Sequence, residues 1–370
     1  MTGQSDARPL DDVWAWFGAR RRGTRYQPTL GANPGEDLNG CVPKLAHLRA
    51  AAYELAGAHV VGVGCSSGYY ESQLAQDARE RLGHGAAHAT LIDTDAVALA
   101  EAVAALPVSR AADVRHFLGA AENIAWTQTY DLCVFLSLYH HYDRLGAAAR
   151  RTGDDVLQAI GAHCQTMVFE TGQTNDTVAG SGVWRHRLAM DDWSSPTAWL
   201  EAEVPRLTGF SRWHVLGTNP VTQRHLYIFW HRTAVTPPAH FAQRRSLRTS
   251  SLPTDRSDGA MLWDATHLVD TARATDAIAV VDAFQRVARP SDFLLVESLS
   301  MVRTIARHAP TIAYVSGRSD TAVEHHLASV VYAGCAAVAT VDNRALTGRC
   351  AARLQALGVS RIDVPRLVED

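Results

Sequence analysis

A glycine-rich loop between an apolar strand and a helix is the feature of the sequence best suited to bind a ligand. It lies in VVGVGCSSGYYESQLA, residues 60–75, and contains Gly62, Gly64, Cys65, Ser66 and Gly68. Small residues let backbone N–H groups approach a ligand closely, and the N-terminus of the following helix favours an anionic group. A dinucleotide-binding fingerprint would have glycine where this sequence has Ser67, so the spacing disfavours NAD.

Later segments place polar residues at or after the ends of apolar, strand-like runs. They are Asp93 and Thr94 in HATLIDTD, Glu122 in FLGAAENI, Ser137, Tyr139, His140 and His141 in YDLCVFLSLYHHYDR, and Glu170 in QTMVFETGQ. Short apolar runs alternate here with helical stretches, which predicts an α/β fold with a parallel, doubly wound sheet. Because such sheets bind ligands beyond the carboxyl ends of their strands, we expect His140 and Glu170 to lie near a ligand.

The order and spacing of these segments resemble those of class I S-adenosylmethionine-dependent methyltransferases. The resemblance implies a Rossmann-like sheet, S-adenosylmethionine as cofactor, and methyl transfer to an oxygen or nitrogen nucleophile. The implied cofactor contacts are Gly62, Gly64, Cys65, Ser66, Gly68, Asp93, Thr94, Glu122 and Ser137. Among them, Asp93 would accept hydrogen bonds from the ribose hydroxyls. His140 and Glu170 are the candidate catalytic bases for an acceptor that must lose a proton.

Three departures from the resemblance favour a competing hypothesis, an inactive methyltransferase-like scaffold or binding protein. Gly62 stands where an acid is usual, Ser66 replaces the middle glycine, and Ala120 replaces an acid near the adenine. Interpretations without any ligand binding also stay open for these residues. A glycine loop can serve tight packing alone, and an Asp between a strand and a helix often caps the helix.

The acceptor is indicated by a more specific resemblance. The segments LSLYHH, FETGQ and TQRHLYIFW resemble the methyltransferase domains of bacterial polysaccharide chain-terminating enzymes. This implies a glycan or phosphorylated acceptor, with another small molecule as the alternative. The candidate substrate contacts are Tyr139, His141, Arg185, Arg187 and Arg224. Arginine suits an anionic group because its guanidinium donates paired hydrogen bonds. No metal site is expected.

The charge balance argues against a nucleic-acid partner, because a net charge of -3 and a pI near 6.6 give no global positive field. The six cysteines are scattered singly, which favours a reducing cytoplasm over a disulfide framework or a metal site. The N-terminal residues lack an apolar signal core, and no apolar run is long enough to span a bilayer. We therefore predict a cytoplasmic protein without a membrane span, and the resemblance to bacterial enzymes implies a bacterial source. A homodimer is one assembly left open.

The length of 370 residues predicts two domains. We expect a cap segment at residues 1–40, a methyltransferase domain at 41–232, a linker at 233–260 and a smaller α/β domain at 261–370. The last contains DFLLVESLSMVRTIARHAP and AVATVDNRALTGRCAARLQALGVSRIDVP. These segments resemble the end of a glycerophosphodiester phosphodiesterase barrel, a partial TIM barrel, and Glu297 at the end of DFLLVES is the candidate acid. Roughly 110 residues cannot build the usual eight strands. We therefore expect this domain to be non-catalytic, with phosphodiester hydrolysis as the alternative.

Overall fold

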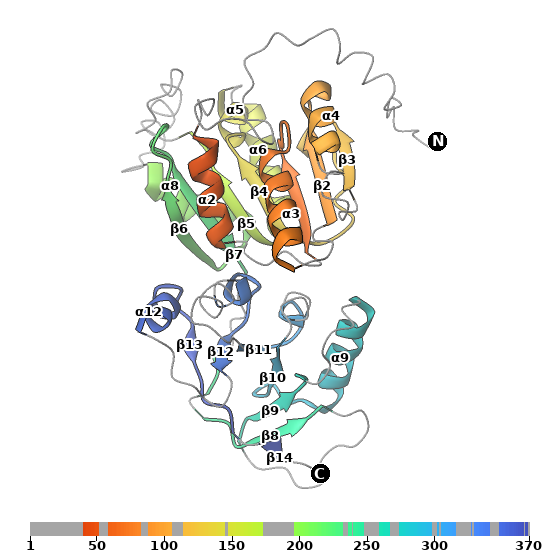
Figure 1. Ribbon diagram of the computed structural model, residues 1–370, viewed down its shortest axis with the longest axis vertical. Coiled ribbons are helices and arrows are strands. Elements are labelled where there is room, and N and C mark those ends of the chain that lie inside the picture. The colour runs from red at the N-terminus through yellow and green to blue at the C-terminus, as the bar shows by residue number, and fades with distance from the viewer. Residues whose placement is uncertain are drawn as a thin grey trace. The chain divides into compact units, whose positions relative to one another are not determined.

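The chain forms two compact units, residues 1–229 and 230–370, in the computed structural model of Figure 1. The structure describes residues 40–51, 58–82, 88–105, 114–144, 147–172, 196–231, 236–238, 240–247, 259–266, 274–297, 302, 305–315, 327, 329–340, 348–365 and 367–368. The cap segment expected at residues 1–40 therefore lies outside the described residues, except for Gly40.

The first unit is built around a largely parallel sheet. Its elements are α2 (Cys41–Ala51), β1 (His59–Val63), α3 (Tyr69–Leu82), β2 (His88–Asp93), α4 (Ala96–Ala105), β3 (Val114–Leu118), η3 (Ala121–Asn123), β4 (Tyr130–Leu136), α5 (Tyr139–Arg144), α6 (Ala147–His163), β5 (Cys164–Glu170), α8 (Pro196–Thr208), β6 (Arg212–Thr218) and β7 (His225–Trp230). The strand order is β3-β2-β1-β4-β5-β7-β6, and the pairs from β3 through β5 are parallel. The prediction of an α/β unit with a parallel sheet is confirmed.

The order of the strands fixes where a ligand can bind. The chain runs outward from β1 through β2 to β3, and then returns to place β4 on the other side of β1. This reversal is a topological switch point, and open α/β sheets bind ligands beyond the carboxyl ends of the strands at such a point. The glycine loop follows β1, so the sequence brings it to this position.

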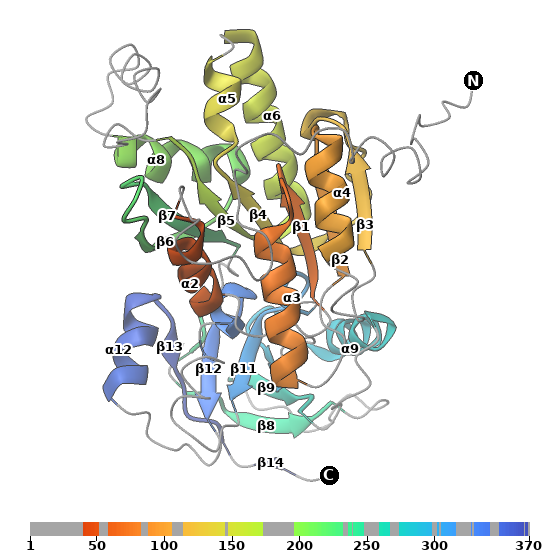
Figure 2. The ribbon, with the colours of Figure 1, turned by 45° about the horizontal axis from the view of Figure 1, so that its top comes forward.

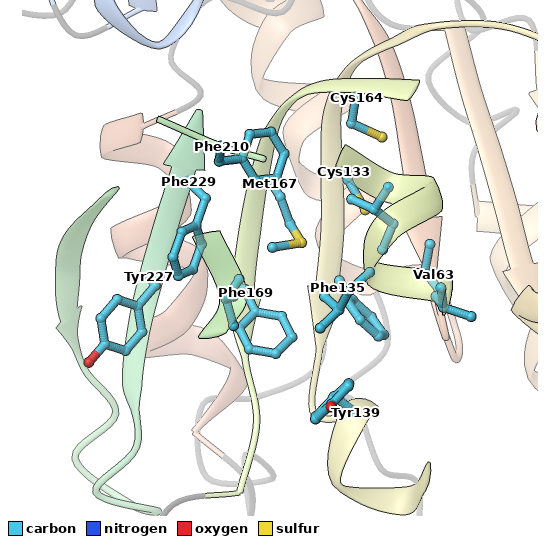
Figure 3. Close-up of a cluster of buried hydrophobic side chains, with 14 of the residues drawn as sticks. Val63, Cys133, Phe135, Tyr139, Cys164, Met167, Phe169, Phe210, Tyr227 and Phe229 are labelled. Carbon is cyan, nitrogen blue, oxygen red and sulfur yellow. The ribbon is translucent and has the colours of Figure 1, made fainter. Parts of the chain in front are cut away.

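Helices cover both faces of the sheet (Figure 2). Alanine and leucine side chains pack α3 and α4 on β2, in a cluster that includes Ala75, Leu91 and Ala102. Large side chains from α6 and α8 pack on the opposite face, where Figure 3 shows Phe135, Phe169 and Phe229 on β4, β5 and β7. Burial of such aromatic side chains contributes much of the stability of a core. The ends of β4 and β5 therefore rest on a rigid base.

The second unit is also α/β. Its elements are β8 (Gln243–Ser246), β9 (Met261–Asp264), α9 (Ala274–Val287), β10 (Phe293–Val296), β11 (Thr311–Val315), β12 (Ala337–Thr340), α12 (Gly348–Ala356), β13 (Ser360–Arg361) and β14 (Leu367–Val368). The strand order is β13-β12-β11-β10-β9-β8-β14, and each neighbouring pair is parallel.

Part of the segment that we expected to be a linker belongs to the second sheet. β8 lies within residues 233–260 and pairs with both β9 and β14. Its sequence, QRRS, lacks the apolar alternation of a typical strand, so the pattern gave no signal. One of its residues, Arg244, instead pairs with Asp264 through Nη2 and Oδ2 at 2.6 Å. An ion pair thus helps to hold β8 beside β9, where other strands are held by apolar burial.

Candidate functional site

The loop between β1 and α3 makes the tight turn that its small residues predict. Gly64, Ser66 and Gly68 have φ values of 68°, 51° and 65°. The backbone N–H groups of Gly64 and Cys65 donate to the carbonyl oxygen of Ile92 at 2.9 and 3.1 Å, which ties the loop to β2. Ser66 adopts the left-handed backbone that glycine favours. The replacement of the middle glycine by serine therefore leaves the turn intact.

Substitutions at two positions of this loop with left-handed backbone should affect the free energy of unfolding differently. A Cβ atom on Gly68 would lie 2.7 Å from Cβ of Ala102, and its φ disfavours any L side chain. We expect Gly68→Ala to lower the free energy of unfolding by about 2 kcal/mol. Ser66→Gly should leave it unchanged or raise it by up to about 1 kcal/mol, because strain is relieved. Denaturant titrations compare the two variants, and equal destabilisation would contradict this account.

Asp93 connects the end of β2 to the glycine loop. Its Oδ2 accepts a hydrogen bond from the N–H of Ser66 at 2.7 Å, and its Oδ1 accepts one from the N–H of Asp95 at 2.8 Å. The cap of α4 is Asp95, whose Oδ1 accepts from the N–H groups of Val97 and Ala98 at 2.9 and 3.2 Å. Asp93 is therefore not the helix cap, and its carboxylate stays beside the loop.

Thr94 and Glu122 follow the carboxyl ends of β2 and β3, and both are exposed. The Oε2 atom of Glu122 accepts a hydrogen bond from the hydroxyl of Tyr142 at 2.8 Å, which links η3 to α5. Burial and this carboxylate raise the pKa of Tyr142, so its hydroxyl stays a donor. Glu122 thus has a defined orientation at the edge of the expected cofactor site.

Cys65 in the loop is a buried thiol. Burial raises its pKa, and the nearby carboxylates of Glu71 and Asp93 raise it further. A thiol becomes a nucleophile only as its thiolate. Cys65 therefore packs within the loop and has no nucleophilic role.

A buried polar cluster joins the ends of β4 and β5 to α2 and β7. Glu170 is fully buried, and its Oε2 is 2.6 Å from Nζ of Lys44 and accepts from Oγ of Ser137 at 2.9 Å. Its Oε1 is 2.9 Å from Nη1 of Arg224. Ser137 itself has a φ of 57° directly after β4, and its N–H donates to the Glu170 carbonyl at 2.7 Å. Two cations and a hydroxyl thus converge on one carboxylate.

Asn219 helps to position both cations of this cluster. It is buried in the turn between β6 and β7, where its N–H donates to the Arg224 carbonyl at 2.8 Å. Its side-chain amide donates to the carbonyl of Gly40, just before α2, at 3.4 Å. A Cβ on Gly40 would lie 2.1 Å from Oδ1 of Asn219, so glycine leaves the room for this contact. The start of α2, which carries Lys44, is thereby held beside the turn that carries Arg224.

The ion pairs argue against Glu170 as a general base. Burial alone would raise the pKa of its carboxyl, but Lys44 and Arg224 outweigh burial and hold the pKa below its usual value. A carboxylate with a lowered pKa and both oxygens occupied is a poor proton acceptor. Glu170 therefore organises the strand ends. Arg224, expected to contact substrate, here binds Glu170.

The three aromatic residues after Ser137 occupy different environments. Tyr139 is fully buried, donates to Asp154, and packs on Trp199 with ring centroids 5.5 Å apart, so it is a core residue and not a substrate contact. Nδ1 of His140 accepts a hydrogen bond from the N–H of Gly172 at 3.3 Å. The neutral ring then carries its proton on Nε2, which suits donation to an acceptor better than proton removal. His141 is exposed and lies 4.3 Å from His140 between ring centroids.

Sequence reasoning overlooked Lys44. It is the only lysine in a chain with 35 basic residues, and this rarity was the available signal. A compact ammonium fits between Ser137 and Glu170, where a planar guanidinium would need more space. Arg185 and Arg187, also expected at the substrate, lie outside the described residues.

A second buried carboxylate, that of Glu71, lies under the glycine loop. Glu71 is 4% exposed, and neither of its oxygens accepts a hydrogen bond from another residue in the described part of the chain. Burial raises its pKa to about 7, its own backbone N–H partly offsets this, and Asp93 adds to the rise. The thiols of Cys65 and Cys133 are the other titratable groups that face it. The raised pKa reflects burial without an offsetting cation among the residues that the structure describes.

This raised pKa predicts how stability depends on pH. The folded protein binds the Glu71 proton more tightly than the unfolded chain, whose value is near 4.5. The free energy of unfolding should therefore fall as pH rises from about 4.5 to about 7, by on the order of 3 kcal/mol from this group. Thermal melting across that range should show a flatter profile for Glu71→Gln than for the parent. Parallel profiles would contradict a perturbed Glu71.

No protein-family model and no curated protein sequence matches the chain. Solved structures with some similarity include the bifunctional kinase-methyltransferase WbdD, at 17% identity and a TM-score of 0.44 over 61% of this chain and 48% of that chain. They also include magnesium protoporphyrin IX methyltransferase (ChlM) from Synechocystis PCC 6803, at 13% identity and a TM-score of 0.39 over 62% of this chain and 100% of that chain. N-methyltransferase NodS from Bradyrhizobium japonicum WM9 matches at 14% identity and a TM-score of 0.37 over 60% of this chain and 97% of that chain.

The chain spans about half the length of WbdD. Within the described residues, no helix has the length and apolar character needed to cross a membrane, and no group of side chains suits a metal ion.

Proposed function

We propose that the first unit is an S-adenosylmethionine-dependent methyltransferase. The observation that carries the proposal is the hydrogen bond between Ser66 and Asp93, which joins the loop after β1 to the acid that ends β2 at the switch point of the sheet. A glycine loop and a carboxylate fixed side by side suit a nucleoside that carries an amino acid on one side and a ribose diol on the other. When bound, the cofactor supplies a methyl group on a positively charged sulfur.

The residues of the chain would bind and orient the reactants. Gly64 and Gly68 allow close approach of the backbone, Asp93 would accept from the ribose hydroxyls, and Glu122 would lie near the adenine. Methyl transfer to a positioned nucleophile depends chiefly on alignment, which the rigid ends of β4 and β5 support. His140 is the group we assign to the acceptor, as a hydrogen-bond donor through Nε2. Glu170 keeps Ser137 and the strand ends in place.

The acceptor is an oxygen or nitrogen nucleophile of a small molecule, with a glycan or phosphorylated end as the favoured class. His141 is exposed beside His140 and is our candidate for contact with it. Arg185 and Arg187 complete the candidate set.

Calorimetric titration of the full chain with S-adenosylhomocysteine tests the proposal. Saturable binding in the micromolar range is expected, as is usual for enzyme ligands. NAD is the matched control, because it also contains adenosine but has no amino-acid group. Absence of heat and of any thermal shift at millimolar S-adenosylhomocysteine would favour the inactive scaffold. Tighter binding of NAD would favour a dinucleotide-binding protein.

We propose that the second unit is a non-catalytic relative of a barrel. Its sequential parallel strand order, in which β14 pairs with β8, is the order of a singly wound barrel and supports this relationship. At the end of β9, one oxygen of Asp264 binds Arg244 at 2.6 Å and the other accepts from the hydroxyl of Thr266 at 2.6 Å. Both oxygens of this carboxylate are therefore occupied by side chains of the same unit. Release of product from a chromogenic phosphodiester with magnesium, calcium or manganese would overturn the proposal.

A further inference from the structure

The carboxylate of Glu71 occupies the space that a side chain on Gly62 would fill. An ideal Cβ atom on Gly62 would lie 2.2 Å from Oε1 of Glu71 and 2.9 Å from its Cδ. Gly62 does not have a positive φ, so its backbone does not require glycine. The absence of a side chain is therefore what matters at this position. It lets an acid from the first turn of α3 reach back under the end of β1.

A buried carboxylate in this position would be stabilised by a cation or a hydrogen-bond donor. Both oxygens of Glu71 are buried and accept no hydrogen bond from another residue in the described part of the chain. An unpaired buried acceptor costs free energy, and a buried charge costs more unless an opposite charge approaches it. Asp93 is nearby and adds negative charge. The buried carboxylate between β1, the loop and α3 is thus complementary to a cation that donates hydrogen bonds.

We propose that Glu71 binds the ammonium group of the cofactor's methionine part, in place of the acid that the end of β1 lacks. This inference rests on the proposed function. Adenine and ribose are neutral, so within that cofactor the ammonium is the cationic hydrogen-bond donor that matches a carboxylate. The contact is direct or passes through one water molecule. The departure at Gly62 then reflects an acid moved from the strand to the helix, and not an acid that was lost.

Two ligands separate this contact from the rest of the site. S-adenosylhomocysteine carries the ammonium, whereas methylthioadenosine has the same nucleoside without the amino-acid group. Glu71→Gln keeps the shape of the side chain and removes its charge. We expect this variant to bind S-adenosylhomocysteine roughly 10- to 100-fold more weakly and methylthioadenosine within about twofold of the parent. Equal loss for both ligands, or no loss for either, would overturn the inference.

A measurement on the parent protein does not depend on how the variant folds. At pH 6 the carboxyl of Glu71 is largely protonated, because its pKa lies near 7. An arriving ammonium favours the carboxylate, so S-adenosylhomocysteine should release up to about one proton, and methylthioadenosine none. Calorimetry in buffers with different ionisation enthalpies counts the protons. Equal proton release with both ligands would contradict the contact.

The double variant Gly62→Asp with Glu71→Ala tests the relocation itself. Truncation at position 71 makes room for a side chain at position 62, which should restore at least tenfold of the affinity lost in Glu71→Ala. No recovery in a folded double variant would count against an equivalent position for the two acids. The possible failures are distinguishable. If the parent binds neither ligand, the proposed function and this inference both fall. If the parent binds S-adenosylhomocysteine and Glu71→Gln binds it equally well, the role of Glu71 falls alone.

Discussion

Replacement of Lys44 by methionine should lower the free energy of unfolding by about 3 kcal/mol. Methionine has a similar length but no charge, so Glu170 would remain fully buried with one cation, Arg224, instead of two. Removal of one partner from a buried ion pair typically costs about 3–5 kcal/mol, and the remaining arginine should keep the loss near the lower end. Thermal melting should show a decrease of roughly 6–12 °C for a unit of this size.

A surface ion pair of the same unit provides the matched control. Arg206 and Glu203 are 2.6 Å apart on α8, but the Arg206 side chain is 65% exposed. Glu203→Ala should therefore change stability by less than about 1 kcal/mol. The pKa of Glu170 is lowered, so the advantage of the parent over Lys44→Met should persist at neutral pH and fall as acid protonates Glu170, below about pH 4.5. If Lys44→Met costs no more than Glu203→Ala, the buried cluster does not stabilise the fold.

Local pattern was sufficient to predict the loop and the strand ends. The loop after β1 needs residues that tolerate positive φ. Gly64, Ser66 and Gly68 adopt such φ values within five consecutive positions. Asp93 follows an apolar run, so its place at the end of a strand could be read from the sequence. These features depend on neighbours along the chain, which is the information that a single sequence contains.

Contacts between distant segments could not be predicted in the same way. Lys44 and Arg224 are separated by most of the first unit, and only the packing of α2 against the turn after β6 brings them to Glu170. Tyr139 shows that a residue at a predicted site position can instead belong to the core. Its position after a strand suggested substrate contact, but α5 directs it into the core against Trp199. Glu71 also escaped notice, because its importance arises from the space at Gly62 and not from any motif.

Asp93→Ala is expected to weaken binding of S-adenosylhomocysteine by roughly 100-fold or more. The substitution would remove the acceptor proposed for the ribose hydroxyls and also the bond that holds Ser66 in the loop. A hydrogen bond to a charged group contributes about 1.5–3 kcal/mol, and two such bonds would account for a loss of this size. Methylthioadenosine should lose affinity to the same extent, because it keeps the ribose. That behaviour differs from the selective loss expected for Glu71→Gln.

Asp95→Ala is the control for this prediction, since Asp95 is two residues away and caps α4 through Val97 and Ala98. Loss of a helix cap costs about 1 kcal/mol of stability, so Asp95→Ala should melt at a lower temperature while its affinity for both ligands stays close to that of the parent. Asp93→Asn keeps one oxygen acceptor without the charge and should fall between the parent and Asp93→Ala. If Asp93→Ala and Asp95→Ala lose affinity equally, the effect of Asp93 comes from the folding of the β2–α4 junction, and the ribose site must be sought at another strand end.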